Sequence, residues 1–141
     1  MGAVILVGRV LFGVVFVAGG ISHFTHTAAT AEFARAKGLK LARPAVLLSG
    51  AVMTAGAAMI AFGVWADLGA LLLVALLLPT AVVMHAYWRE SDPQVRALEQ
   101  IQFTKDISLA GAAIMVFGFV VALGGELAFT LTPPLSTLVW S

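Results

Sequence analysis

Residues 45–88 read AVLLSGAVMTAGAAMIAFGVWADLGALLLVALLLPTAVVMHAYW, a stretch with one acidic side chain, Asp67, and no lysine or arginine. Two apolar runs, residues 45–64 and 68–88, are joined by a short turn at GVWAD, residues 63–67. Each run is close to the roughly 20 residues that a helix needs to cross about 30 Å of hydrocarbon. Because so short a connection joins only antiparallel neighbours, the stretch predicts a transmembrane helical hairpin.

Two further apolar runs, residues 2–24 and 106–123, have a similar length and character. Of the 141 residues in the chain, 61% are hydrophobic and 11% are charged, whereas a soluble domain of this size needs far more polar surface. We therefore predict an all-α membrane protein. Residues 1–125 form its four-transmembrane-helix bundle, and residues 126–141 form an apolar interfacial tail. The first run could also be a secretory signal, but it lacks a preceding basic region and contains Arg9.

The composition also excludes several kinds of chemistry. The chain has no cysteine, so it forms no disulfide, thiol redox centre or thiolate metal site. A net charge of +1 gives no indication of a nucleic-acid-binding surface. We expect no intrinsic cofactor, so any electrons that the protein handles must pass through a molecule bound to it.

The segments between the spans carry helix signals of their own. ATAEFARAKG, residues 29–38, combines helix-forming residues with Gly38 as a terminator, which predicts a short interfacial helix. Further on, Ser91 or Asp92 is a suitable N-cap and Pro93 suits the first helical position. Nothing interrupts a helix from 93 to 123, so the fourth helix should extend into the cytoplasm by roughly two to three turns.

Lysine and arginine residues give the predicted orientation. Seven of the eight lie in the segments between spans one and two and between spans three and four: Arg35, Lys37, Lys40, Arg43, Arg89, Arg96 and Lys105. The positive-inside rule places these segments in the cytoplasm, so we expect a multi-pass protein of the bacterial inner (plasma) membrane with both termini outside the cytoplasm. The tail is interrupted by Pro133 and Pro134 and is too short to cross again. Its Trp140 suits the outer membrane interface.

The eighth basic residue, Arg9, lies within the first span. It recurs with Gly13, Phe16, Gly20 and His23 at spacings of three and four, which place these residues on one stripe of the helix, facing the bundle. An arginine at this depth costs several kcal/mol unless it is paired or reaches the interface. Asp67 and Glu126 lie on the same side of the membrane. We predict a structural ion pair between Arg9 and Asp67, because the tight turn fixes Asp67 in place.

Polar residues converge at the opposite end of the bundle. The third span should be kinked at Pro79, with Thr80 compensating locally for the lost backbone bond. We predict a quinone-type pocket there, with His26 only at its rim, because a quinone carbonyl needs donors and histidine titrates near neutral pH. The predicted pocket residues come from three spans: His23, His85, Gln102, Lys105 and Asp106.

Two other interpretations of this end compete with the quinone-type pocket. Tyr87 and Trp88 are typical of an aromatic belt at the membrane interface. The three histidines with an acid could hold a metal ion, but the spacing of His23 and His26 is unspecific, and we predict no metal site.

GRVLFGVVFVAGGISHF, PTAVVMHAYW and QFTKDISLAGAA together resemble the DoxX family of small four-span bacterial membrane proteins. The family takes its name from a subunit of a thiosulfate:quinone oxidoreductase. The resemblance implies an integral subunit of a redox-associated membrane complex linked to quinones and oxidative stress, in contact with lipid and with protein partners or further copies of itself. Two alternatives are a structural membrane protein that anchors soluble partners and stabilises a larger assembly without its own chemistry, and a transporter.

Overall fold

The computed structural model describes residues 1–139, and these residues form helices joined by short segments, without any strand. Four helices are long and apolar enough to cross a membrane, which confirms the predicted all-α membrane fold. They are α1 (Gly2–Thr25), α3 (Ala42–Phe62), α4 (Ala66–Met84) and α5 (Pro93–Leu123). Shorter elements connect or follow them: α2 (Thr27–Ala36), η1 (Tyr87–Arg89), η2 (Gly124–Glu126) and α6 (Leu135–Val139).

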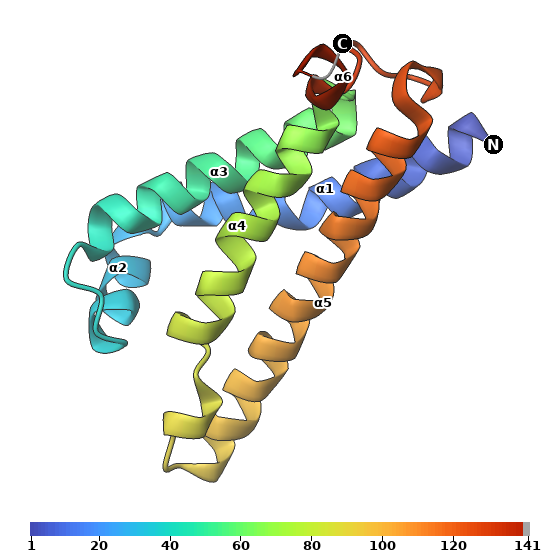
Figure 1. Cartoon of the computed structure of the whole chain (residues 1–141). Coiled ribbons are helices and arrows are strands. Elements are labelled where there is room, and N and C mark those ends of the chain that lie inside the picture. Colours follow the sequence, from blue (N-terminus) through green and yellow to red (C-terminus); the bar gives the residue numbers. More distant parts are fainter. Residues whose placement is uncertain (140–141) are drawn as a thin grey trace.

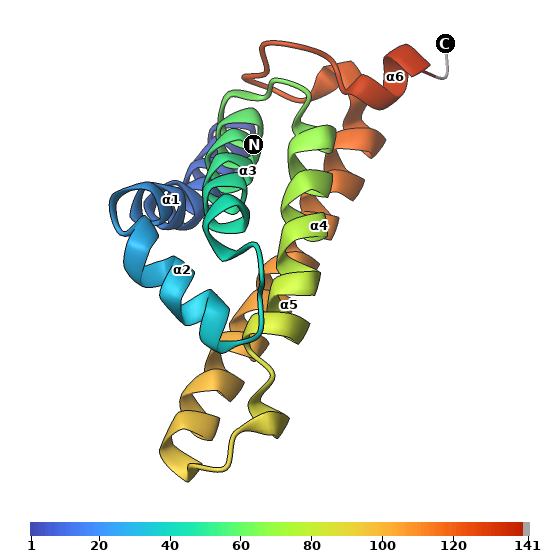
Figure 2. The ribbon, with the colours of Figure 1, turned by 90° about the vertical axis from the view of Figure 1, so that its left-hand side faces the viewer.

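The four long helices form two antiparallel pairs that cross each other (Figure 1). Helix α1 packs along α3, α4 packs along α5, and α3 and α4 join the pairs. The chain termini and the α3–α4 turn lie at one end of the bundle, the termini end, whereas α2 and η1 lie at the other, the loop end (Figures 1 and 2). All four helices contribute to the buried core: Phe16, Ala57, Ile60, Ala70, Leu73, Leu77, Ala110 and Ala113.

Small residues allow these helices to approach closely. A Cβ added at Gly20 of α1 would lie 2.9 Å from the carbonyl oxygen of Gly50 in α3. A Cβ at Gly69 of α4 would likewise lie 2.9 Å from the carbonyl oxygen of Gly56 in α3. Backbone-to-backbone packing of this kind is the usual means of helix association in lipid.

Helix boundaries follow the local signals, with one clear difference. The predicted turn at 63–67 forms, and Gly63 ends α3 in the left-handed region with φ of 64°. The third span was predicted to continue to Trp88, but α4 ends at Met84, and His85 and Ala86 are not helical. Helix α4 runs through Pro79, and the Thr80 hydroxyl donates to the carbonyl of Leu76 at 2.8 Å.

Both predicted connecting helices are present. Helix α2 covers most of the predicted interfacial segment and ends at Ala36. Helix α5 spans Pro93–Leu123 as predicted, and the Asp92 carboxylate caps it by accepting from the backbone N–H groups of Gln94 and Val95. At about 1.5 Å per residue, a helix of 31 residues is longer than the hydrocarbon core is thick.

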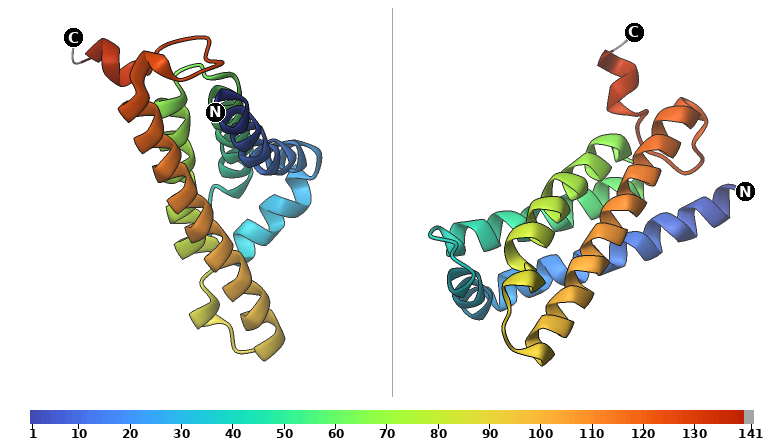
Figure 3. Two further views of the ribbon diagram at one scale, coloured as in Figure 1. Left: turned by 90° about the vertical axis from the view of Figure 1, so that its right-hand side faces the viewer. Right: turned by 60° about the horizontal axis from the view of Figure 1, so that its bottom comes forward.

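The tail folds back over the termini end and is bonded to the α3–α4 turn (Figure 3). The N–H groups of Leu131 and Thr132 both donate to the carbonyl of Gly63 at 3.1 Å, and the N–H of Trp65 donates to the Thr132 hydroxyl at 2.9 Å. Leu127 is buried against Ala66 and Val120, so the first part of the tail belongs to the packed structure. The predicted interfacial residue Trp140 lies outside the described residues.

Candidate functional site

Arg9 lies in α1 at the termini end and is only 4% exposed. Its guanidinium donates to the carbonyls of Ile60 and Ala61, each at 2.8 Å, where the C-terminus of α3 has carbonyls without helical partners. It also donates to two tail carbonyls, those of Ala128 at 3.1 Å and Phe129 at 2.9 Å. One side chain therefore connects the first helix, the second span and the tail.

The sequence predicts Asp67 as the partner of Arg9, but in the structure Asp67 bonds to other groups. Its two carboxylate oxygens accept from the backbone N–H groups of Leu135 at 3.0 Å and Ser136 at 2.8 Å, at the start of α6. Among residues 1–139 no carboxylate forms an ion pair with Arg9. The predicted Arg9–Asp67 ion pair is therefore wrong. Free carbonyls and amides at helix ends satisfy both charges, which sequence spacing did not anticipate.

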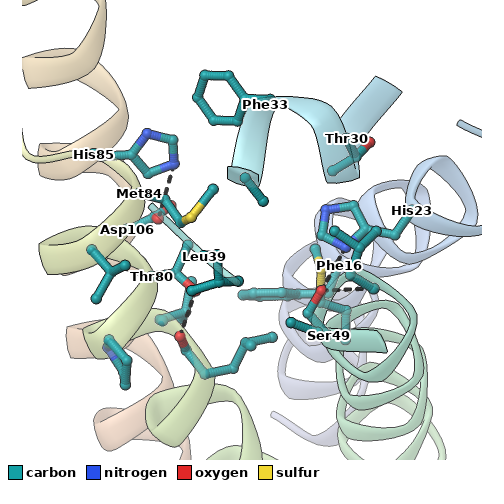
Figure 4. Close-up of a pocket in the computed structure, with 18 of the residues that line it drawn as sticks. Phe16, His23, Thr30, Phe33, Leu39, Ser49, Thr80, Met84, His85 and Asp106 are labelled. Atoms are coloured by element: carbon teal, nitrogen blue, oxygen red, sulfur yellow. Dashed lines mark hydrogen bonds and ion pairs between the residues drawn. The ribbon is translucent and has the colours of Figure 1, made fainter. Parts of the chain in front are cut away.

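A cavity of about 400 Å³ opens at the loop end. Its walls come from α1, α2, α3, α4 and the start of the membrane-spanning part of α5, and most of the lining is apolar. Figure 4 shows His23 and His85 on opposite sides of this space, with Thr30 and Phe33 of α2 across one edge. The cavity is within the size range of small-molecule sites, which are typically about 300–1,000 Å³.

His23 is held in a defined orientation by α3. Its Nδ1 lies 2.7 Å from the Ser49 hydroxyl oxygen, and that hydroxyl donates to the carbonyl of Val46 at 2.9 Å. A serine hydroxyl has one proton, so both bonds form only when Nδ1 of His23 carries the proton and donates to Ser49. The geometry therefore selects one tautomer of His23.

His85 belongs to a second network that connects four segments of the chain. Its Nδ1 lies 2.7 Å from one carboxylate oxygen of Glu99, and Lys37 lies 2.7 Å from the other. Lys37 also binds Glu90 at 2.6 Å. The Nε2 of His85 lies 3.7 Å from Asp106 across the cavity wall. The break in the helix after Met84 is what allows His85 to meet Glu99 of α5.

The Lys37 ammonium is the cation of this network. Burial lowers the pKa of Lys37, but its hydrogen bonds to Glu90 and Glu99 and the charges of those carboxylates outweigh burial, so the pKa lies above its usual value. Lys37 therefore stays charged at neutral pH, and its positive charge compensates the negative charge of the buried Glu99 carboxylate.

Four of the five predicted pocket residues line the cavity: His23, His85, Lys105 and Asp106. Gln102 does not line it, and instead accepts a hydrogen bond from Lys105 at 2.5 Å. His26 is exposed outside the cavity and pairs with the neighbouring Thr25 hydroxyl. Residues 1–139 contain no group of three or more histidine or acidic side chains arranged to hold a metal ion.

The predicted site residues omit several polar residues of this region, among them Lys37, Ser49 and Glu99. The available signal for Glu99 was its spacing of seven from Asp106, which places both carboxylates on one face of α5. Lys37 and Ser49 gave no comparable signal, because their roles depend on how α2 and α3 fold back onto the bundle.

Comparison with known proteins gives one result. The family model for DoxX matches residues 4–86, more than half of the chain, from α1 to the end of α4. No curated protein and no solved structure matches the chain.

Proposed function

The chain belongs to the DoxX family, and from this premise we propose that it is an integral subunit of a redox-associated membrane complex that holds a quinone-type lipid in its loop-end cavity. The observation that carries the proposal is the cavity itself. It combines a largely apolar lining with two histidines, a lysine and a carboxylate, which come from α1, the segment after α4, and α5. An apolar ring with polar atoms at its edge requires this combination.

The orientation of the chain is part of the proposal. All seven basic residues outside α1 lie toward the loop end, which the positive-inside rule assigns to the cytoplasm of a bacterial inner membrane. The cavity would then open near the cytoplasmic surface. A reporter fused at Ser141 should be active only outside the cytoplasm, and a cytoplasmic signal from a folded fusion would reject this orientation.

A second function, anchoring of a protein partner, is favoured by a different surface. The first turns of α5 carry Val95, Leu98 and Ile101, which are 40%, 64% and 63% exposed. Apolar side chains on a segment that extends beyond the loop end are suited to a partner protein. Co-purification of a partner that is lost in a Leu98→Glu, Ile101→Glu variant, with cavity binding retained, would favour anchoring as the main role.

The direct test of the cavity is binding of decylubiquinone, a short-chain quinone, to the purified protein in mild detergent. We expect saturable binding that Ala45→Phe weakens at least about tenfold, because the ring fills space at the cavity wall. Ala29→Phe, the same change at an exposed position of α2, is the matched control and should bind normally. Absence of saturable binding of both decylubiquinone and its hydroquinone by the unmodified protein, or normal binding by Ala45→Phe, would reject the proposed function.

A further inference from the structure

The hydroxyl groups on the cavity wall already use their protons. Ser49 donates to the carbonyl of Val46, Thr80 to that of Leu76 at 2.8 Å, and Thr30 to that of His26 at 3.0 Å. A hydroxyl has one proton and two lone pairs, so each of these groups can offer a ligand only an acceptor.

The two imidazole rings are arranged in the same sense. With its Nδ1 proton donated to Ser49, neutral His23 has a lone pair at Nε2, and the described residues supply no hydrogen-bond partner for that atom. Nδ1 of His85 donates to the ionised Glu99 carboxylate, which can only accept. The Nε2 atom of His85 lies 3.7 Å from a carboxylate oxygen of Asp106.

Lys105 is the one lysine or arginine side chain on the described cavity wall, and two protein groups, Gln102 and Asp106, compete with a ligand for its three N–H donors. Its side chain is 50% exposed, it donates to Gln102, and it lies 3.5 Å from Asp106. The described wall therefore presents mainly acceptors: the Nε2 atom of His23, the hydroxyl lone pairs and the Asp106 carboxylate.

This pattern discriminates between the two redox forms of a quinone. The oxidised form has two carbonyl oxygens, which accept hydrogen bonds and would face other acceptors. The reduced form, a hydroquinone, has two hydroxyl groups that can donate to them. A ligand that leaves the buried acceptors of its site without a donor binds less tightly. Sites that bond to a hydroxyl group of their ligand therefore reject analogues that lack it.

We infer that the cavity selects the hydroquinone form over the quinone form, with Nε2 of His23 accepting a hydrogen bond from a ring hydroxyl. The inference rests on the proposed function, and it concerns binding alone, without any electron transfer within this chain. The direction of the hydrogen bond is opposite to the one predicted from the sequence, in which the histidines donate to a quinone carbonyl.

The test compares three probes on the purified protein in mild detergent without oxygen: decylubiquinone, its hydroquinone, and the dimethyl ether of that hydroquinone. The ether keeps the ring but has no hydroxyl proton. We expect the hydroquinone to bind at least about tenfold more tightly than either other probe. Equal or tighter binding of the quinone would overturn the inference and leave the proposed function intact, whereas no binding of any probe would overturn both.

Two variants locate the effect. His23→Leu should lower the ratio of hydroquinone to quinone affinity toward one, because it removes the acceptor but keeps an apolar side chain. His26→Ala, outside the cavity, should keep the ratio of the unmodified protein. Thermal unfolding identifies any variant that is not folded. The affinity ratio of the unmodified protein tests the inference even if a variant does not fold. An unchanged ratio in a folded His23→Leu protein would reject the assignment to His23.

Discussion

The two ends of the bundle both bury charged groups, but they satisfy those groups differently. At the termini end, the guanidinium of Arg9 and the carboxylate of Asp67 bond to backbone carbonyls and amides, which fixes the positions of helices and tail. At the loop end, His85 and Lys37 both bond to the side chain of Glu99, and polar atoms of other residues line a cavity. Charged groups whose bonds all go to the backbone stabilise the fold. Polar groups that keep an unbonded atom facing a cavity are suited to bind a ligand.

Removing Arg9 should give the largest effect on stability. Arg9→Leu removes the guanidinium donor from four carbonyls, those of Ile60, Ala61, Ala128 and Phe129, although Ile60 keeps a weaker bond from the Gly63 N–H at 3.3 Å. We expect a loss of about 3–5 kcal/mol in the free energy of unfolding. Thermal or denaturant unfolding in mild detergent measures it. Arg35→Leu, at an exposed position, is the control and should change stability little. A stable Arg9→Leu protein would contradict the structural role of the termini end.

Loss of Glu99 tests the network at the loop end. Glu99→Leu leaves Lys37 and His85 without a shared buried partner, and we expect about 2–3 kcal/mol of destabilisation. The variant should also release the Nδ1 proton of His85 from its fixed acceptor, so ligand binding should fall together with stability. Unchanged unfolding and binding in Glu99→Leu would show that the network contributes to neither property.

Asp67→Ala should have a smaller effect, because only the cap at the start of α6 is lost. We expect about 1–2 kcal/mol, the usual effect of a removed N-cap side chain. The double variant Arg9→Leu, Asp67→Ala provides the sharper measurement. It should be no more stable than Arg9→Leu, since the two residues do not bind each other. If the double variant were more stable than Arg9→Leu, that result would be evidence for the Arg9–Asp67 ion pair, which the structure does not contain.

The histidines should give the smallest changes in stability and the largest contrast with binding. His23→Ala and His85→Ala should each lower hydroquinone affinity at least about tenfold, at a stability cost of about 1 kcal/mol for His23 and somewhat more for His85. His26→Ala should change neither measurement. If all three variants bind normally, these histidines are interface residues and the loop end has no ligand site of this kind.

Most of the fold could be predicted from the sequence, because it depends on local properties. The length of the apolar runs, the GVWAD turn, and the cap formed by Asp92 and Pro93 each specify an element within a few residues. The early end of α4 was missed, since the apolar pattern continues through His85 and Trp88 while the chain leaves the helix to reach α5. After this departure His85 contacts Glu99, a partner 14 residues away in the sequence.

The candidate site was predictable only in part, for a related reason. Convergence of His23, His85 and Asp106 follows from topology, since three spans meet at one end. Pairing of individual polar groups does not, because the backbone offers as many partners as the side chains do. Arg9 illustrates this point: a search for a carboxylate overlooks the unpaired carbonyls at the end of every helix.

The partners of Arg9 also have a consequence for the order of membrane insertion. Helix α1 is synthesised before the groups to which Arg9 bonds: two of the acceptors follow 51 and 52 residues after Arg9, and the other two follow 119 and 120 residues after it. At a synthesis rate of about 5–20 residues per second, Arg9 waits on the order of ten seconds for the complete set. During that interval α1 carries an uncompensated charge, which favours its retention at the insertion machinery or at the lipid headgroups. We therefore expect α1 to reach its final position in the bilayer only after Ala128 and Phe129 have been synthesised.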